Sequence, residues 1–248
     1  MSKPLHKRLS GAAFRGLNWA LGQAGYRVER FDQVNFLEPL LYRRLAKAPD
    51  FFFVQIGAND GVFHDPIRQF VTRNHVAGLA VEPLKDFFQR LVENYRDYPR
   101  VKPVNVAVHA SAKSLEIHRV DPARAAQLGE WTKGIASFKE SHHRINQVPD
   151  EVMIRETVQC VTLAELLDQH RVTRVDLLQV DTEGYDLEIL KMVDFTRIKP
   201  AIIHFEHGLP AQTMTVEQFK ECSNRLLDHG YRIITEPYDA TAYLPDLV

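Results

Sequence analysis

The sequence predicts an α/β fold in which helices cover both faces of a mostly parallel, doubly wound sheet. From residue 51 onward, short runs of apolar, β-forming residues alternate with segments of helical periodicity, which is the pattern of right-handed strand–helix–strand crossovers. The first run, 51–56 (FFFVQI), stops at Gly57, and Gly61 follows four residues later. A strand, a glycine turn and a helix start in this order predict a ligand-binding crevice at the carboxyl end of the first strand.

The remaining elements follow the same alternation, with a less regular middle. After the first strand we expect strands at 78–82, 101–108, 115–120, 156–161, 175–180, 200–206, 231–236 and 241–244. We expect helices at 65–74, 83–95, 163–169, 185–193 and 216–229. Asp65 is a candidate N-cap before Pro66, Thr162 a candidate N-cap before 163–169, and Gly230 ends the last helix. The polar stretch 127–149 is expected to be a loop.

Residues 1–48 read as a helical extension, and residues 49–248 as the main domain. Apolar residues recur at four-residue spacing from Leu5 to Leu21 among lysines and arginines, and a second helix is expected over 36–46. A basic amphipathic helix can make a peripheral membrane contact. Packing over the main domain, or a contact in a homo-oligomer, explains the same pattern, because an apolar stripe usually faces a core.

Composition excludes several classes of function. The formal net charge of the 248 residues is −1, so no overall field favours nucleic acid. The two cysteines, Cys160 and Cys222, stand far apart without a CxxC partner, which argues against a disulfide framework or a zinc site. We find no apolar run that approaches the roughly 20 residues of a membrane span, and no clear signal peptide. We therefore expect a cytoplasmic protein.

Acidic residues stand where the predicted strands end. They are Glu82, Asp181, Glu183 and Glu206. Because the carboxyl ends of neighbouring parallel strands line one crevice, we expect these side chains to face a shared site. Glu82 lies about twenty residues after the glycine turn, the separation at which an acid meets the ribose hydroxyls of an adenine cofactor. The alternative role for Glu82 is a favourable charge at a helix start.

The glycine turn does not have the spacing of a dinucleotide fingerprint, because Gly57 and Gly61 do not give G-x-G-x-x-G. The run 55–61 (QIGANDG) resembles instead the acid-x-G-x-G-x-G turn of class I S-adenosylmethionine-dependent methyltransferases. Gln55 replaces the acid of that turn, and Asn59 replaces its central glycine. Asparagine tolerates left-handed backbone better than most residues, so the second change is conservative.

With later motifs included, the resemblance narrows to the FkbM family of methyltransferases. The matching segments are 54–61 (VQIGANDG), 81–83 (VEP), 105–108 (NVAV), 134–138 (GIASF), 161–163 (VTL), 180–184 (VDTEG), 186–190 (DLEIL) and 202–206 (IIHFE). The resemblance implies a Rossmann-like domain with a seven-stranded sheet. It also implies methyl transfer from S-adenosylmethionine, most often to a hydroxyl of a sugar, polysaccharide or secondary metabolite.

Carried over residue by residue, the resemblance assigns a cofactor site. The turn residues Gly57, Ala58, Asn59, Asp60 and Gly61 would wrap the methionine end of the cofactor. Glu82, followed by Pro83, would hold the ribose, and Asn105 and Ala107 would lie by the adenine. Asp181 would face the methionine portion or the acceptor, and Ser137 would line the site or be a simple loop serine.

An alcohol acceptor needs a base for its proton. The candidates are Asp181, Glu183, His204, Glu206 and His64. A buried histidine such as His204 is more often a hydrogen-bonded structural residue. The acids could instead hold Mg²⁺ through oxygen ligands, but D-x-E spacing is also common in hydrogen-bonded turns, and we assign no metal ligands. The pair His142-His143 is expected to be solvated in its polar loop.

Two rival functions stay open at this point. One is an NAD-dependent or nucleotide-sugar-dependent enzyme on a similar sheet. The other is a catalytically inactive Rossmann-like module that recruits partners, because a fold does not by itself establish activity. We expect the partner of an active enzyme to be a small-molecule or glycan acceptor. Its pocket would be built from the irregular region 109–150 and from the N-terminal helices, since loops usually carry specificity.

Overall fold

The computed structural model describes residues 35–129, 132, 135–140, 142–145 and 147–248. Contacts within the chain divide it into two units, Met1–Phe36 and Leu37–Val248, and the elements below belong to the second. The amphipathic helix expected between Leu5 and Leu21 therefore lies outside the described residues. In the described part of the chain, no helix is both long enough and apolar enough to cross a membrane.

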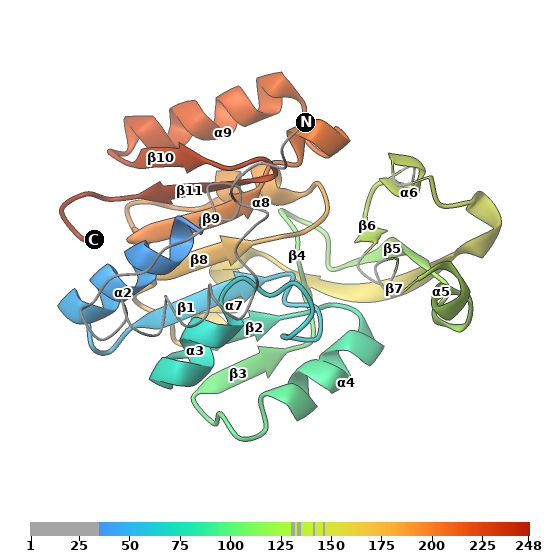
Figure 1. Ribbon diagram of the computed structural model, residues 1–248, viewed down its shortest axis with the longest axis horizontal. Coiled ribbons are helices and arrows are strands. Elements are labelled where there is room, and N and C mark those ends of the chain that lie inside the picture. Colours follow the sequence, from blue (N-terminus) through green and yellow to red (C-terminus); the bar gives the residue numbers. More distant parts are fainter. Residues whose placement is uncertain (1–34, 130–131, 133–134, 141, 146) are drawn as a thin grey trace, which may run out of the picture. The chain divides into compact units, whose positions relative to one another are not determined.

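A seven-stranded sheet forms the centre of the second unit (Figure 1). Its strand order is β10-β11-β9-β8-β1-β2-β3. All neighbours pair in parallel except β11, which runs antiparallel to both β10 and β9. The strands are β1 (Phe52–Ile56), β2 (Ala77–Val81), β3 (Val101–Val104), β8 (Leu177–Val180), β9 (Ile202–Glu206), β10 (Arg232–Thr235) and β11 (Asp239–Tyr243). This order confirms the predicted mostly parallel α/β fold.

Helices cover both faces of this sheet. Side chains of α2 (Leu37–Lys47), α3 (Arg68–Asn74) and α4 (Lys85–Asn94) share one core cluster with Phe53 and Leu177. Side chains of α7 (Leu163–Gln169), α8 (Asp186–Met192) and α9 (Val216–Asp228) share the other with Val54 and Leu178. Because successive side chains of a strand point to opposite faces, these two clusters are the two sides of a doubly wound sheet.

Helix α2 belongs to the main unit, although residues 1–48 were expected to form an extension. Its residues Leu37, Leu40 and Leu41 are buried in a core cluster with the sheet. The Arg44 guanidinium also lies 2.7 Å from the buried Asp176 carboxylate, which precedes β8. The division between units therefore falls after Phe36 and not after residue 48. Burial of this apolar stripe accounts for the difference.

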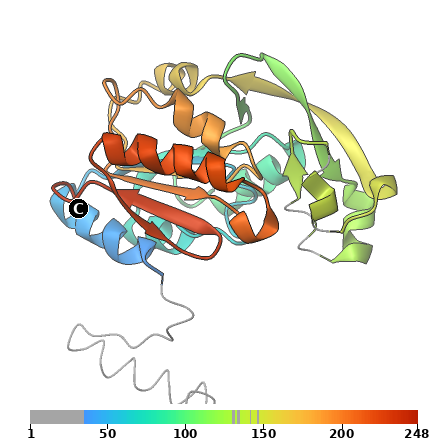
Figure 2. The ribbon, with the colours of Figure 1, turned by 90° about the horizontal axis from the view of Figure 1, so that it is seen from above.

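A second, four-stranded sheet has the order β4-β7-β5-β6. Its strands are β4 (Ala107–Val108), β5 (Ser114–Val120), β6 (Ala136–Ser137) and β7 (Met153–Val161). β5 pairs antiparallel along its whole length with residues 153–159 of β7, and the last two residues of β7 pair in parallel with β4. Together with α5 (Pro122–Leu128), α6 (His142–Ile145) and the short helix η4 (Asp150–Val152), they make up what we call the arm, residues 107–161. Figures 1 and 2 show the arm extending to one side of the main sheet.

The arm contains most of the errors in the predicted elements. The strand expected at 101–108 is two strands in two sheets, β3 and β4. Between them, the Asn105 side chain donates hydrogen bonds to the carbonyl oxygens of Glu82 and Pro83 and turns the chain away from β2. The stretch 127–149, expected to be a loop, contains β6 and α6.

The helix starts were predicted with mixed success. Thr162 caps α7 in a reciprocal capping box with Glu165, as expected. Asp65 accepts hydrogen bonds from the N–H groups of Ile67 and Arg68, but α3 begins only at Arg68. Pro66 is therefore not the first helical residue. The remaining connection of note is the short helix η5 (Leu209–Ala211) after β9.

Candidate functional site

One face of the main sheet changes from apolar to polar to acidic toward its carboxyl edge. The strand registers align Phe53, Leu177, Ile202 and Tyr243 in a first row. Gln55, Gln179, His204 and Thr241 are aligned in the next row. Two residues further along the same strands come Gly57, Asp181 and Glu206, and Asp239 on β11 pairs with Glu206. Residues in register share a face of the sheet, so the three rows form one continuous gradient.

A cavity of about 710 Å³ opens at this edge, within the roughly 300–1,000 Å³ of typical small-molecule sites. The structure brings most of the predicted site residues to its wall: Gly57, Ala58, Asn59, His64, Glu82, Pro83, Ala107, Ser137, Asp181, Glu183, His204 and Glu206. It does not bring Asp60, Gly61 or Asn105 there. The arm supplies part of the wall through Ile117 in β5 and the segment 135–138.

The glycine turn has no backbone donor left over. The N–H groups of Gly57 and Ala58 both donate to the Val81 carbonyl, and that of Gly61 donates to the Ala58 carbonyl. The N–H groups of residues 59, 60, 62 and 63 donate to the side chains of Glu82, Asn59, Asp60 and Asp60 respectively. A pyrophosphate needs such donors. The turn therefore shapes the chain around a ligand without offering a phosphate cradle.

Gly57 is required for the close approach of β1 and β8. Its φ is +82°, and a Cβ at this position would overlap the carbonyl oxygen of Asp181. Asn59 also has positive φ, as its place in the turn predicts. Gly61 packs against the side chains of Leu91 and Tyr95, at 2.6 and 2.7 Å from a hypothetical Cβ. The three residues thus hold the turn against the sheet and against α4.

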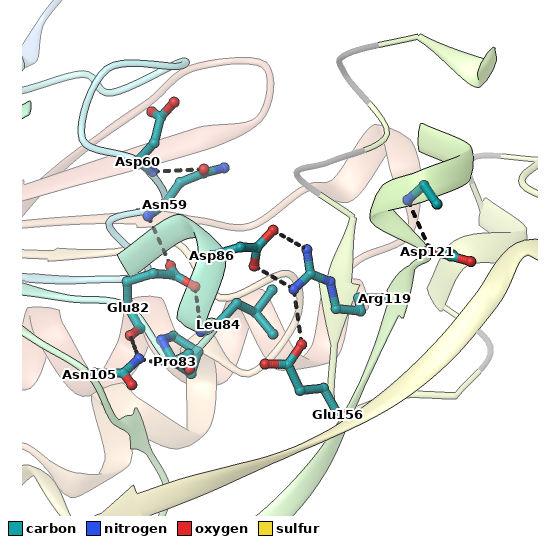
Figure 3. Close-up of polar contacts among 11 residues, drawn as sticks. Asn59, Asp60, Glu82, Pro83, Leu84, Asp86, Asn105, Arg119, Asp121 and Glu156 are labelled. Carbon is teal, nitrogen blue, oxygen red and sulfur yellow. Dashed lines mark hydrogen bonds and ion pairs between the residues drawn. The ribbon is translucent and has the colours of Figure 1, made fainter. Parts of the chain in front are cut away.

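Glu82 is buried just after the end of β2 and accepts hydrogen bonds from two backbone N–H groups (Figure 3). Its Oε2 accepts from the Asn59 N–H and its Oε1 from the Leu84 N–H, each at 2.9 Å. Burial raises the pKa of Glu82 to about 7, against these hydrogen bonds, which lower it. Each carboxylate oxygen keeps a second lone pair. Two vicinal hydroxyls can therefore still donate to Glu82, which is what a ribose requires.

The carboxyl groups at the strand ends, which we call the acidic row (Asp181, Glu206 and Asp239), are partly buried close together and therefore resist ionisation. Burial first, and then the charges of Glu183 and Asp186, hold the pKa of Asp181 well above its usual range. Burial, followed by the charge of Asp181, likewise raises the pKa of Glu206. No described residue of the cavity wall is a lysine or arginine. In the described part of the chain, no group of three or more His, Cys, Asp or Glu side chains is arranged to hold a metal ion. A cationic organic ligand is the natural complement of such a wall.

His204 lies at the bottom of the cavity as a neutral imidazole. Its Nδ1 is 2.9 Å from Oγ1 of Thr241 on the neighbouring strand. Burial lowers the pKa of His204 to about 4. A group with this pKa is a weak general base near neutral pH. Its position suits hydrogen bonding to a ligand better than proton removal.

His142 and His143 are buried, so the expectation that they are solvated was wrong. His142 Nε2 lies 2.8 Å from Oε2 of Glu183, and His143 Nε2 lies 2.6 Å from Oδ1 of Asp150. Ser137 Oγ donates to the Glu183 carbonyl at 2.8 Å. Glu183 has the strained φ of +53°. The arm therefore fixes a strained acid at the cavity wall from two sides.

A buried ion-pair network fastens the arm to α4 (Figure 3). The side chain of Arg119 in β5 is 4% exposed. It donates to both carboxylate oxygens of Asp86 in α4, at 2.6 and 2.9 Å, and to Glu156 in β7 at 3.0 Å. It also lies over the ring of Phe87, which lines the cavity. The network thereby sets where the arm meets the cavity.

Sequence reasoning missed several residues of this site. Gln179, Thr213, Tyr238 and Asp239 line the cavity, and Arg119 positions part of its wall. One signal was present in the sequence. The three central strands end in QIG, QVD and HFE, which places a polar residue two positions before each glycine or acid. The equal spacing indicates that Gln55, Gln179 and His204 share a row.

The fold and the cavity define a class I methyltransferase crevice. The turn at β1 offers no phosphate cradle, and acids stand at the ends of β2, β8 and β9. A family model described as the methyltransferase FkbM domain matches residues 55–233. The chain therefore belongs to the FkbM methyltransferase family, and the resemblance read from the sequence is confirmed.

Comparison with solved structures gives weak likenesses. The Methanococcus jannaschii fibrillarin pre-rRNA processing protein is 13% identical, with a TM-score of 0.40 over 79% of this chain and 66% of its own. Human methyltransferase 10 domain containing protein is 12% identical, with 0.42 over 95% and 98%. The N-terminal domain of human METTL16 in complex with SAH is 11% identical, with 0.43 over 93% and 81%. No curated protein matches the sequence.

Proposed function

We propose that this chain transfers the methyl group of S-adenosylmethionine to a hydroxyl oxygen of a sugar, polysaccharide or secondary metabolite. The observation that carries the proposal is the acid-lined cavity beside a glycine turn without free backbone donors. S-adenosylmethionine carries a sulfonium and an ammonium group against a single carboxylate, so its net charge is positive, and its two cationic groups suit a wall of carboxyl groups. Membership in the FkbM methyltransferase family supports the same reaction.

In this proposal, one group of residues binds the cofactor and another lies on the side of the acceptor. Glu82 accepts hydrogen bonds from the ribose, while the turn at Gly57 lets the ligand lie close to the strand ends. Asp181 and Glu206 stand at the ends of the neighbouring strands β8 and β9, on the acceptor side. Positioning supplies much of the catalysis, because the oxygen must approach the methyl carbon in line with the departing sulfur.

The acidic row supplies the base. When bound, the cofactor supplies an electrophilic methyl group, and its positive charge lowers the pKa of neighbouring carboxyls. One member of the Asp181–Glu206 pair, ionised beside the cofactor's positive charge, would accept the proton of the acceptor hydroxyl. The oxygen would bond the methyl carbon that the cofactor supplies, and the sulfur would keep the electron pair of the bond it gives up. Atoms and charges balance without a further reactant.

The rival dinucleotide and nucleotide-sugar functions receive no support from the cavity. Both ligands carry a pyrophosphate, which calls for free N–H groups or basic side chains. The N–H groups of residues 57–63 are all bonded within the chain. The described wall holds no lysine or arginine.

Calorimetric titration tests the cofactor. S-adenosylmethionine should release or absorb heat on binding to the purified full chain, and NAD should not. Binding of NAD alone would reject the proposal. Incubation with S-adenosylmethionine carrying a radiolabelled methyl group should then label small molecules or glycans of a cell extract. Cofactor binding without transfer to any acceptor would favour the inactive-module alternative.

The Glu82→Gln variant tests the ribose contact. Loss of one carboxylate acceptor should weaken S-adenosylmethionine binding by about 1–3 kcal/mol, because a ribose hydroxyl loses its partner. Glu93→Gln, on the exposed surface of α4, is the control and should bind as the wild type does. Unchanged affinity in Glu82→Gln would remove Glu82 from the cofactor site.

A further inference from the structure

Gln55, Gln179 and His204 form a row that we call the floor of the cavity. Side chains buried inside a sheet at such positions are usually apolar, but here they are amides and an imidazole. Gln55 and Gln179 are only 1% and 2% exposed. They stand side by side on β1 and β8 and line the cavity, with His204 next in register on β9. The described residues give neither glutamine Oε1 a hydrogen-bond partner. A buried polar atom without a partner is costly, so both atoms point to a ligand that donates hydrogen bonds.

The acidic side chains of the wall stand directly above this floor. Asp181, Glu206 and Asp239 follow the row at the strand ends, and all three line the cavity. The described lining contains no lysine or arginine, and burial lowers the pKa of His204 to about 4. A phosphate or carboxylate on the acceptor would find no lysine or arginine in the described wall to balance its charge, and it would repel any of these acids that is ionised. Hydroxyl and ammonium groups would find acceptors on every side.

Aromatic rings stand beside the polar groups in the cavity wall. Tyr238 directly precedes Asp239 and is 52% exposed. Phe63 and Phe138 also line the cavity, the latter from the arm. Flat, apolar surfaces of this kind suit the carbon face of a ring-shaped ligand, while the amides suit its hydroxyls.

We propose that Gln55, Gln179 and His204, beneath the acids Asp181, Glu206 and Asp239, form an acceptor subsite. It takes an uncharged or amine-bearing sugar ring and rejects rings that carry phosphate or carboxylate. This inference rests on the proposed methyl transfer to a hydroxyl and narrows its acceptor. The glutamine oxygens accept from ring hydroxyls, and the acids accept from a hydroxyl or an ammonium group.

Saturation-transfer NMR tests the selection directly and does not depend on turnover. The probes are a set of common hexoses at millimolar concentration, each as the neutral methyl glycoside, the amino sugar, the uronic acid and the 6-phosphate. The full chain is saturated with S-adenosylhomocysteine so that only the acceptor side is open. We expect transfer to neutral and amino members of at least one hexose and none to the corresponding acids and phosphates.

The Gln179→Leu variant tests the floor at nearly constant volume. It should fold at least as stably as the wild type, because it removes a buried acceptor without a partner. We expect a tenfold or greater loss of sugar affinity with S-adenosylmethionine affinity unchanged in calorimetry. Gln159→Leu on the exposed side of β7 makes the same chemical change outside the cavity and should bind the sugars normally.

Three results would overturn the proposal. The first is a saturation-transfer signal from the phosphorylated or carboxylated sugars that equals or exceeds that of the neutral ones. The second is the absence of a signal from every neutral and amino sugar. The third is undiminished sugar binding by Gln179→Leu. Failure of S-adenosylmethionine to bind would instead count against the proposed reaction. The sugar experiment, repeated without nucleoside, would then still report on the subsite.

Discussion

Gly57 is the residue on which the geometry of the site depends most. It lies at the carboxyl end of β1, where any side chain would collide with the Asp181 carbonyl of the adjacent strand. The close approach brings the acid of β8 next to the turn that follows β1. Other residues could adopt the positive φ at some energetic cost, but no residue with a Cβ could fit into the space beside the Asp181 carbonyl.

A pair of glycine substitutions separates space from conformation. Gly57 and Gly230 have nearly the same φ, +82° and +87°, but a Cβ at Gly230 meets nothing within 4 Å. Gly230→Ala should lower the free energy of unfolding by about 1–2 kcal/mol, the cost of left-handed backbone. Gly57→Ala should lower it by about 4 kcal/mol or more, since the backbone must also move. Urea unfolding measures both, and equal losses would show that the close approach is no constraint.

Among single residues, those predicted best combine a chemically suitable side chain with a fixed spacing from a recognisable turn. Glu82 was predicted from its spacing after a turn, and it lies at the cavity. Asp60, Gly61 and Asn105 were predicted to contact the cofactor, but their side chains or backbones serve the loops around it. His142 was missed because the contact that buries it joins residues 41 positions apart. Local patterns cannot report such a pairing.

Among the elements, the arm is the part that gives this domain its individual site. The helices and parallel strands of the main sheet follow from local periodicity, and most of them were predicted to within a few residues. The arm depends on pairing between β5 and β7, which are separated by α5, β6 and α6. Strands were predicted at 115–120 and 156–161, but the polar stretch 127–149 between them resembles a loop, so their pairing, β6 and α6 were not expected. Yet it provides Ile117, Ser137 and Phe138 to the cavity wall.

Removing the Arg119 network should loosen the arm. Arg119→Met leaves Asp86 and Glu156 with partial access to water, so we expect a loss of about 1–3 kcal/mol in stability, less than for a fully enclosed pair. The kcat/KM for the acceptor should fall several-fold while the Kd for S-adenosylmethionine changes little, because the arm forms the far wall of the cavity.

Arg155→Met is the matched control for this prediction. Arg155 lies on the same arm and makes ion pairs with Glu116 and Glu140, but all three side chains are exposed. Such pairs are worth about 0–1 kcal/mol, so stability and acceptor kinetics should stay near those of the wild type. A similar loss in both variants would show that the arm is not fastened through Arg119 in particular.

For the molecule as a whole, the dominant electrostatic feature is a concentration of buried carboxyl groups in a nearly neutral chain. Burial raises the pKa of Glu82 to about 7 and that of Asp186 to about 6, and it also raises the pKa values of Asp181 and Glu206. The folded chain without ligand therefore holds protons that the unfolded chain would release. Stability from these groups is fully present below their unfolded pKa values and is lost as pH rises through the folded ones.

The ligand-free protein should accordingly become less stable from about pH 6.5 to about pH 8.5, by about 2 kcal/mol. His204, whose pKa burial lowers to about 4, has the opposite effect only below about pH 6.5. Asp150 and Glu165, with pKa values of about 2, lose their contributions only in stronger acid. Thermal unfolding across this range measures the slope, and Glu206→Gln should flatten it. Stability that rises with pH would contradict the charge arrangement.

The acidic row also bears on how a catalytic cycle would end. In the proposed reaction, a sulfonium would face an ionised carboxylate before transfer, and this ion pair would hold the cofactor in place. After transfer the sulfur would be a neutral thioether and the carboxylate would have taken up a proton, so both charges would disappear together. The cavity would then bind S-adenosylhomocysteine more weakly than S-adenosylmethionine, which would favour release of the spent cofactor after each turnover. We expect S-adenosylhomocysteine to have a higher Kd than S-adenosylmethionine in calorimetry, and the gap should narrow in Glu206→Gln.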